Sequence, residues 1–286
     1  FQYSYQAMLD IDVLLAKARL ALELKAFKPA VRTDNSFSLI RARHPLIDPQ
    51  KCVPVDIALG KEYDSLIITG PNTGGKTVTL KTIGLLCLMA QCGLHIPAAE
   101  GSCVPIFDKV LADIGDEQSI EQSLSTFSAH MVNIVNVLKE CGDGSLLLFD
   151  ELGAGTDPVE GAALAVSILE DARAHGCVIA ATTHYAELKV YATNTPGVMN
   201  ASCEFDVQSL QPTYRLLTGI PGKSNAFAIS ARLGLDPRVI ETAKQQMDAE
   251  SIRFEDVLTQ LEIKRQQLEK EKEEIDRLHA KQEEDS

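Results

Sequence analysis

The spacing of apolar residues changes several times along this chain, and each change marks a different predicted element. Over residues 1–28 apolar side chains recur at helical spacing, and Pro29 ends the pattern, which predicts an N-terminal helix. Residues 30–64 are instead rich in strand-forming residues, with a turn at 43–46. From residue 65 to 235, short apolar runs alternate with helical segments. This alternation predicts an α/β fold with a mostly parallel sheet and helices on both faces.

The last part of the chain departs from this alternation. Residues 198–205 and 213–217 predict two strands near a sheet edge, and residues 224–233 and 237–247 predict two short helices. From residue 250 the composition becomes highly charged, and apolar residues repeat every seven positions, at Phe254, Leu261, Leu268 and Ile275. Charged residues interrupt the second apolar stripe, so we expect an imperfect, coiled-coil-like helix that serves as a linker or arm.

One glycine-rich loop points to the chemistry. Residues 70–77 read GPNTGGKT and fit G-x-x-x-x-G-K-[ST], the phosphate-binding loop of nucleotide hydrolases. A predicted strand at 65–69 precedes the loop and a predicted helix at 78–92 follows it, as the motif requires. Backbone N–H groups and the helix N-terminus favour phosphate there, and Lys76 and the Thr77 hydroxyl are expected to reach phosphate oxygens and Mg²⁺. The residues expected to bind nucleotide are Gly70, Pro71, Asn72, Thr73, Gly74, Gly75, Lys76 and Thr77.

Two further strand ends carry polar groups that complete such a site. The apolar run at 145–149 predicts a central parallel strand, and Asp150 and Glu151 follow it at the edge where α/β sheets bind ligands. We expect Asp150 on the metal side and Glu151 as the general base that activates water. A second apolar run ends at Thr182, and His184 follows it. We expect His184 to contact the γ-phosphate or position the attacking water.

The order of these motifs resembles the ATPase domain of the MutS family, within the wider ABC-type ATPases. The stretches that carry the resemblance are GPNTGGKT at 70–77, DELGAGTDPVEGAALA at 150–165 and TTHYAEL at 182–188. A fourth, QSLSTFSAH at 122–130, resembles the family's signature segment, which reaches the ATP of the opposite subunit and so implies that Ser125 and Thr126 act in trans. The transporter form L-S-G-G-Q is absent from this stretch, which argues against a transporter motor. The F-S-x-H of the fourth stretch and the GAGTDP loop are most similar to the second-type bacterial MutS paralogue.

The resemblance implies an ATP- and Mg²⁺-dependent homodimer with two composite sites. It divides the chain into a connecting helix at 1–29, an ATPase domain at 30–249 with dimer-forming helices at 224–247, and a charged heptad helix at 250–286. The family acts on branched DNA to suppress recombination and on stalled, collided ribosomes, and the sequence leaves open which target applies. We expect an excised fragment that contacts DNA or ribosome through missing segments and carries no nuclease domain. The alternative is a nucleotide-controlled dimerisation module with little turnover.

Three weaker assignments rest on the same resemblance. The family has an H-P element beside the nucleotide, so His44 either lies near the base or ribose or is a turn histidine. Val53 falls where family members stack a side chain on adenine, and would give apolar contact. Gln118 and Gln122 are candidates for a glutamine that senses the metal, and the sequence leaves open which of them, if either, has that role.

The composition of the chain limits the class of protein and the cellular compartment that it fits. Hydrophobic residues make up 45% of the 286 residues, enough for a sizeable core. The formal net charge of −13 argues against strong nucleic-acid binding by this chain alone, because phosphate neutralisation dominates such affinity. The seven cysteines lack metal-ligand spacing, and we find neither a signal peptide nor an uninterrupted membrane-length apolar stretch. We therefore expect a cytoplasmic protein with no membrane contact.

Overall fold

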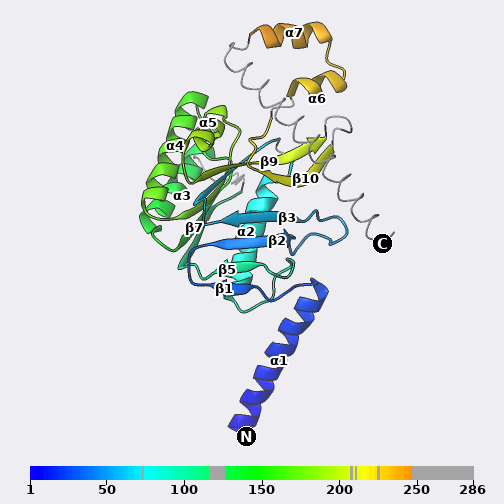
Figure 1. The fold of residues 1–286 in the computed structure, drawn as a ribbon, viewed down its shortest axis with the longest axis vertical. Coiled ribbons are helices and arrows are strands. Elements are labelled where there is room, and N and C mark those ends of the chain that lie inside the picture. Colours follow the sequence, from blue (N-terminus) through cyan, green and yellow to red (C-terminus); the bar gives the residue numbers. More distant parts are fainter. Residues whose placement is uncertain (72–73, 116–125, 207–208, 210, 224–225, 247–286) are drawn as a thin grey trace, which may run out of the picture.

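The computed structural model describes residues 1–71, 74–115, 126–206, 209, 211–223 and 226–246. Its centre is a six-stranded sheet with the order β10-β9-β4-β8-β7-β6 (Figure 1). All neighbours in this sheet run parallel except the β10–β9 pair at one edge. The strands are β4 (Ser65–Thr69), β6 (Lys109–Asp113), β7 (Ser145–Phe149), β8 (Val178–Thr182), β9 (Val198–Asp206) and β10 (Gln211–Thr218). The predicted mostly parallel sheet is confirmed, and so are the two strands predicted near a sheet edge, β9 and β10.

Helices cover both faces of this sheet, and the strand side chains alternate between them. In β4, Leu66 and Ile68 pack with α2 (Lys76–Gln91), whereas Ile67 packs into a separate cluster on the opposite face. That opposite face carries α3 (Thr126–Glu140), α4 (Pro158–Ala174) and α5 (Ala186–Asn194). Because both faces of β4, β7 and β8 are buried, their sequences are continuous apolar runs rather than alternating ones.

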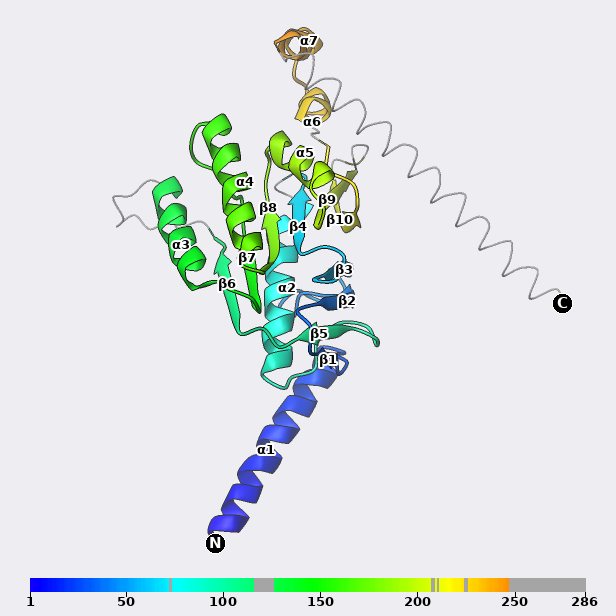
Figure 2. The same cartoon turned by 60° about the vertical axis from the view of Figure 1, so that its left-hand side comes forward.

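A second, smaller sheet packs on the other side of α2. Its order is β1-β5-β2-β3, from β1 (Ala30–Arg32), β5 (Cys103–Pro105), β2 (Phe37–Ala42) and β3 (Val55–Leu59). Side chains of β2 and β3 share one apolar cluster with α2 and the large sheet, so α2 lies between the two sheets (Figure 2). The predicted strand content of residues 30–64 is therefore correct, whereas β5 was not predicted.

The N-terminal helix α1 (Gln2–Glu23) buries none of its residues and extends away from the small sheet (Figure 2). The predicted helix reached residue 28, and the structure ends it at Glu23. The chain leaves the helix there because Lys25 adopts a left-handed conformation with φ of 48°. The Arg43 side chain then donates to the carbonyl oxygen of Leu24 at 2.8 Å and fixes this turn.

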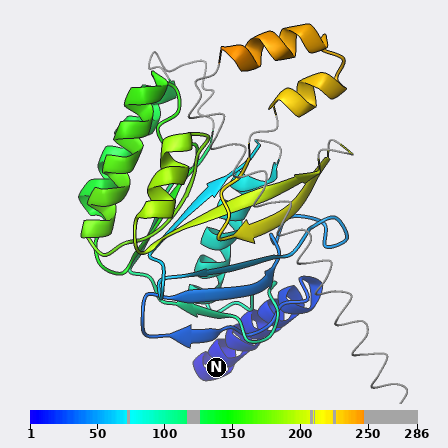
Figure 3. The ribbon, with the colours of Figure 1, turned by 45° about the horizontal axis from the view of Figure 1, so that its top comes forward.

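The helices α6 (Ala226–Arg232) and α7 (Pro237–Gln245) lie apart from the two sheets, in gold and orange in Figure 3. Asp236 caps α7 by accepting a hydrogen bond from the backbone N–H of Arg238 at 2.9 Å. These are the two short helices predicted at 224–247. The heptad helix predicted at 250–286 lies outside the described residues.

Candidate nucleotide site

The phosphate-binding loop connects the end of β4 to the start of α2. Gly75 is the N-cap of α2 with φ of 92°, a left-handed conformation that favours glycine. A side chain on Gly74 would place its Cβ 2.9 Å from the Cβ of Cys203, so this position has no room for one. Asn72 and Thr73, predicted to bind phosphate, lie outside the described residues. The described part of the loop has the expected strand–loop–helix context.

Lys76 lies at the centre of the loop with 2% exposure. Its Nζ donates to the carbonyl oxygen of Gly70 at 2.7 Å and lies 3.3 Å from Nε2 of His184. Burial lowers the pKa of this amine, while the carboxylates of Glu151 and Asp150 oppose that shift. A phosphate oxygen in the loop would give the buried cation a charged acceptor in place of a neutral carbonyl.

The Asp150 carboxylate, at the end of β7, is held by two hydroxyl groups. Thr77 Oγ1 donates to Asp150 Oδ2 at 2.6 Å, and Thr182 Oγ1 donates to Asp150 Oδ1 at 2.5 Å. Asp150 is 8% exposed, so these hydrogen bonds stabilise a carboxylate largely removed from water. Strand order explains the contact with Thr182, because β8 is the neighbour of β7.

The Thr77 hydroxyl and the Asp150 carboxylate fit a magnesium ion that arrives with a nucleotide. Mg²⁺ is typically held by one or two carboxylates together with substrate phosphates and water. Among the residues that the structure describes, no three His, Cys, Asp or Glu side chains are grouped so as to hold a metal. The two neighbouring oxygen groups are therefore suited to a shared ion whose other ligands come from phosphate and water.

Glu151 has a strained backbone that its surroundings hold in place. Its φ is 49°, a conformation that costs a non-glycine residue about 1–3 kcal/mol. Its backbone N–H donates to Thr182 Oγ1 at 2.8 Å, and the N–H of Leu152 donates to the carbonyl oxygen of Thr182 at 2.9 Å. The conformation turns the carboxylate toward His184, where Oε1 lies 3.4 Å from Nε2.

The His184 ring lies between the loop lysine and the acidic strand. Burial, followed by the positive charge of Lys76, holds the pKa of His184 below its ordinary value of 6.5, although Glu151 opposes this shift. Nε2 accepts from Lys76 when it carries no proton and donates to Glu151 when it does. The ring therefore connects the groups predicted to bind phosphate and to activate water.

A cavity of about 470 Å³ opens beside the loop. Val53, predicted to contact the base, lines it together with Gly75, Tyr214 and His44, for which the sequence left open a place near the base or ribose and a turn. A Cβ on Gly75 would lie 3.1 Å from Cδ1 of Tyr214, so the tyrosine ring directly flanks the loop. Tyr214 was not predicted. It lies within a register irregularity of the β10–β9 pair, between Pro212 and Leu216, and has φ of 59°, and neither feature leaves a signal in the sequence.

Residues 66–250 match the family model described as MutS domain V. The chain belongs to the MutS domain V family. It is 61% identical over 256 residues to "Endonuclease MutS2" of Caldanaerobacter subterraneus subsp. tengcongensis, covering 90% of this chain and 32% of that protein. It is 58% identical over 282 residues to "Endonuclease MutS2" of Geobacillus kaustophilus, covering 96% of this chain and 36% of that protein.

A third relative, "Endonuclease MutS2" of Clostridium beijerinckii, is 60% identical over 259 residues, covering 91% of this chain and 33% of that protein. The predicted resemblance to the second-type MutS paralogue is confirmed. This MutS domain V chain spans about a third of the length of the curated relatives it matches.

Residues 126–130, the described part of the predicted signature segment, lie beside the edge strand β6, away from the loop of the same chain. Thr126 is the exposed first residue of α3, beside β6. The strands β8 and β7 separate β6 from β4, which leads into the loop. Ser125, Gln118 and Gln122 lie outside the described residues.

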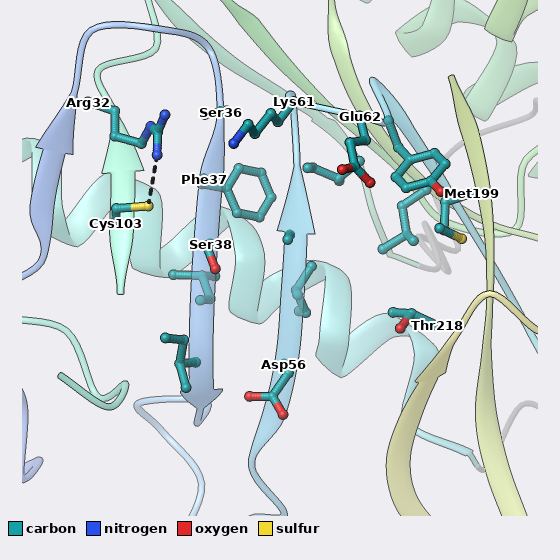
Figure 4. Close-up of a pocket in the computed structure, with 17 residues that line it drawn as sticks. Arg32, Ser36, Phe37, Ser38, Asp56, Lys61, Glu62, Cys103, Met199 and Thr218 are labelled. Atoms are coloured by element: carbon teal, nitrogen blue, oxygen red, sulfur yellow. Dashed lines mark hydrogen bonds between the residues drawn. The ribbon is translucent and has the colours of Figure 1, made fainter. Parts of the chain in front are cut away.

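A larger cavity of about 640 Å³ lies along the small sheet (Figure 4). Arg32, Lys61, Glu62 and Met199 are among its lining residues, and its lining includes none of the residues predicted for the nucleotide site. In the described part of this MutS domain V chain, none of the helices combines the length and apolar character needed to span a membrane.

Proposed function

We propose that this domain binds and hydrolyses ATP with Mg²⁺. The observation that carries the proposal is the meeting of three strand ends, which bring Lys76, Asp150, Glu151 and His184 into one hydrogen-bonded group. Membership of the MutS domain V family supports it. The sequence of the loop and the neighbouring cavity fit a nucleotide, with phosphates at the loop and the base near Val53 and Tyr214.

Each residue then has a defined role. The loop N–H groups and Lys76 bind the β- and γ-phosphates, and Thr77 and Asp150 hold the ion that enters with them. Glu151 takes a proton from the attacking water, and His184 positions that water or the γ-phosphate. Bound Mg²⁺ supplies charge stabilisation at the transferred phosphoryl group.

The Glu151→Ala variant tests this assignment. It keeps the loop, so we expect ATP binding to persist while turnover falls by about a hundredfold or more, the range typical of a lost general base. Glu100→Ala is the matched control, because it removes an exposed carboxylate near the small sheet. Steady-state turnover at saturating ATP and Mg²⁺ would be measured for both. Unchanged turnover in Glu151→Ala would refute the general-base role.

We further propose that two copies close on two ATP molecules, with Ser125 and Thr126 of one copy completing the site of the other. The family match and the distant position of α3 support this arrangement. Light scattering of Glu151→Ala with and without ATP and Mg²⁺ tests it. A nucleotide-dependent increase from the mass of one chain to that of two is expected. A single chain in both conditions, with ATP bound, would argue against composite sites.

The conformational change would act on nucleic acid, either branched DNA or a stalled ribosome. The proposal rests on the resemblance to the second-type MutS paralogue, which the similarity to relatives named "Endonuclease MutS2" supports. The ATPase-active protein would be titrated with a four-way DNA junction and, separately, with collided ribosomes, and turnover would be recorded. Stimulation by the junction alone would favour the DNA role, and stimulation by ribosomes alone would favour the ribosomal one. Stimulation by neither would contradict this part of the proposal.

A further inference from the structure

A buried carboxylate outside the nucleotide site holds the helix that begins with the signature threonine. Asp113 is the last residue of β6 and is 5% exposed. Its Oδ2 lies 2.9 Å from Nδ1 of His130, and its Oδ1 accepts from Nδ2 of Asn133 at 2.8 Å. Beside a carboxylate oxygen, Nδ1 of His130 is the ring nitrogen that carries the proton. Both oxygens of one carboxylate are thus bound by side chains one turn apart on α3.

The same aspartate is also connected to the metal side of the nucleotide site. The backbone N–H of Asp150 donates to the carbonyl oxygen of Asp113 at 2.8 Å. A second contact joins α3 to the loop that follows Glu151, where a Cβ on Gly155 would lie 3.2 Å from the Cβ of Phe127. The first turns of α3 therefore contact both the end of β6, which is bonded to Asp150, and the loop that follows Glu151.

The first half of α3 contains no fully buried apolar side chain. The buried residues of the helix are Ile134 and Val137, both in its second half. Thr126 and the following turn are instead held by the polar contacts of His130 and Asn133 with Asp113. Hydrogen bonds to a buried charge are directional and strong, so they set the position of the helix start more sharply than partly exposed apolar side chains would.

We propose that Asp113 is a positioning residue that, through His130 and Asn133, fixes the start of α3 for the nucleotide site of a second copy of this chain. The inference rests on the proposed function, in which Thr126 acts across a dimer. Asp113 would also link the two sites, because it is bonded to Asp150 of its own site through its backbone and to the partner-facing helix through its side chain.

Single substitutions test the positioning role. His130→Ala removes the donor, and we expect kcat for ATP to fall about tenfold, which corresponds to about 1.4 kcal/mol in the barrier. The dissociation constant for ATP should not change, because the loop is intact. His130→Asn places an amide nitrogen near the position of Nδ1 and should recover most of the loss. An equal loss in His130→Asn and His130→Ala would overturn the proposal.

Asn133→Ala has a matched control on the same helix. Asn136 is exposed, so Asn136→Ala makes the same chemical change at a position away from Asp113. We expect kcat to fall severalfold in Asn133→Ala and to stay at the parent value in Asn136→Ala. Equal kcat values for these two variants would overturn the role of Asn133.

Mixed dimers distinguish action on the partner from action within one chain. Two kinds of mixed dimer are prepared from differently tagged copies. In the first, one subunit carries Glu151→Ala and the other carries His130→Ala. In the second, one subunit carries both changes and the other carries none. With the changes on different subunits, the site that keeps Glu151 faces an intact α3, so the turnover of one site remains. With both on one subunit, the surviving site faces the changed helix, and its turnover is about tenfold lower.

Two outcomes of the mixed dimers would overturn the proposal. Higher turnover with both changes on one subunit would mean that His130 serves its own site, and equal turnover would mean that it serves neither selectively. The Glu151→Ala homodimer separates these results from a failure of the proposed function, because turnover in that homodimer would refute the general-base role itself.

Discussion

Replacing Thr182 by valine removes one hydroxyl from the centre of the candidate site and changes little else. Thr182 is the last residue of β8 and is completely buried. Valine has nearly the same volume and the same branching at Cβ, so the strand and its packing are preserved. The effect of the substitution therefore measures what the hydroxyl contributes to Asp150 and Glu151.

The expected loss can be worked out from two hydrogen bonds. The hydroxyl donates to Asp150 Oδ1 at 2.5 Å and accepts from the backbone N–H of Glu151 at 2.8 Å. A hydrogen bond to a charged group contributes about 1.5–3 kcal/mol, and a buried N–H left without a partner costs about 1–3 kcal/mol. Because both depend on one hydroxyl, the losses are not additive. We expect the free energy of unfolding to fall by about 3 kcal/mol.

Turnover should fall together with stability. The backbone of Glu151 is held at φ of 49° partly by its bond to Thr182, so losing that bond releases the carboxylate from its orientation toward His184. Asp150 loses one of its two hydroxyl donors, and we expect a higher Mg²⁺ concentration for half-maximal turnover. Thr182→Ser keeps the hydroxyl and should retain both properties.

The neighbouring residue provides the control. Thr183 is 1% exposed, and its hydroxyl accepts from the backbone N–H of Tyr185 at 3.2 Å, away from the carboxylates. Urea unfolding and Mg²⁺-dependent turnover would be measured for Thr182→Val, Thr182→Ser and Thr183→Val. Equal destabilisation by the two valine substitutions, or parent-like turnover in Thr182→Val, would refute the reasoning.

Three further predictions follow from other parts of the site. Because the pKa of His184 is lowered in the folded protein, its ring is neutral at pH 7, and turnover should fall only as the pH drops through a value below 6.5. A midpoint of this fall at or above pH 6.5, or the same fall at acid pH in His184→Asn, would contradict the prediction. Tyr214→Ala should weaken ATP binding severalfold in a fluorescent-nucleotide titration, by about 1 kcal/mol for the lost ring contact, while Tyr214→Phe should bind like the parent. Gly153→Ala should lower the melting temperature, because Gly153 has φ of +85° and a Cβ there would lie 2.4 Å from the carbonyl oxygen of Gly161. Gly142→Ala should leave the melting temperature unchanged, because a Cβ on Gly142 would have no neighbour within 4 Å. Equal melting temperatures for the two variants would exclude this steric cause.

Much of the large sheet was predictable because burial on both faces leaves a continuous apolar run in the sequence. The strands β4, β7 and β8 are each buried along their whole length, and each was predicted. The same runs drew attention to Asp150, which follows β7 directly, and to His184, two residues after β8, whereas Lys76 was predicted from the loop motif that follows β4. The family match confirms the resemblance drawn from their order.

The features that sequence reasoning missed depend on contacts between distant residues. The strand β5 has three residues and becomes a strand only by pairing with β1 and β2. The end of α1 is set by Arg43, which reaches back 19 residues to the carbonyl oxygen of Leu24. The pairing of Asp113 with His130 joins a strand end to a helix, and neither residue type predicts the other in isolation.

The order of the strands explains why Thr182, at the end of β8, lies between the loop and the acidic pair Asp150 and Glu151. In the chain β7 precedes β8, but in the sheet β8 lies between β4 and β7 and pairs with both. Neighbouring strands are about 4.8 Å apart, so the ends of β4 and β7 are separated by about 10 Å. The space above the end of β8 is where phosphate and metal would have to fit, so the residue there must be short.

The same residue must also be polar, because Asp150 and the N–H of Glu151 both turn toward it. Thr182 satisfies the two requirements, and Nε2 of the nearby His184 lies 3.4 Å from Oε1 of Glu151. A larger polar residue at 182 would fill the space that the phosphate needs, and an apolar one would leave a buried carboxylate and a strained backbone without their shared partner. The two hydrogen bonds therefore favour a short hydroxyl residue, serine or threonine, at this position.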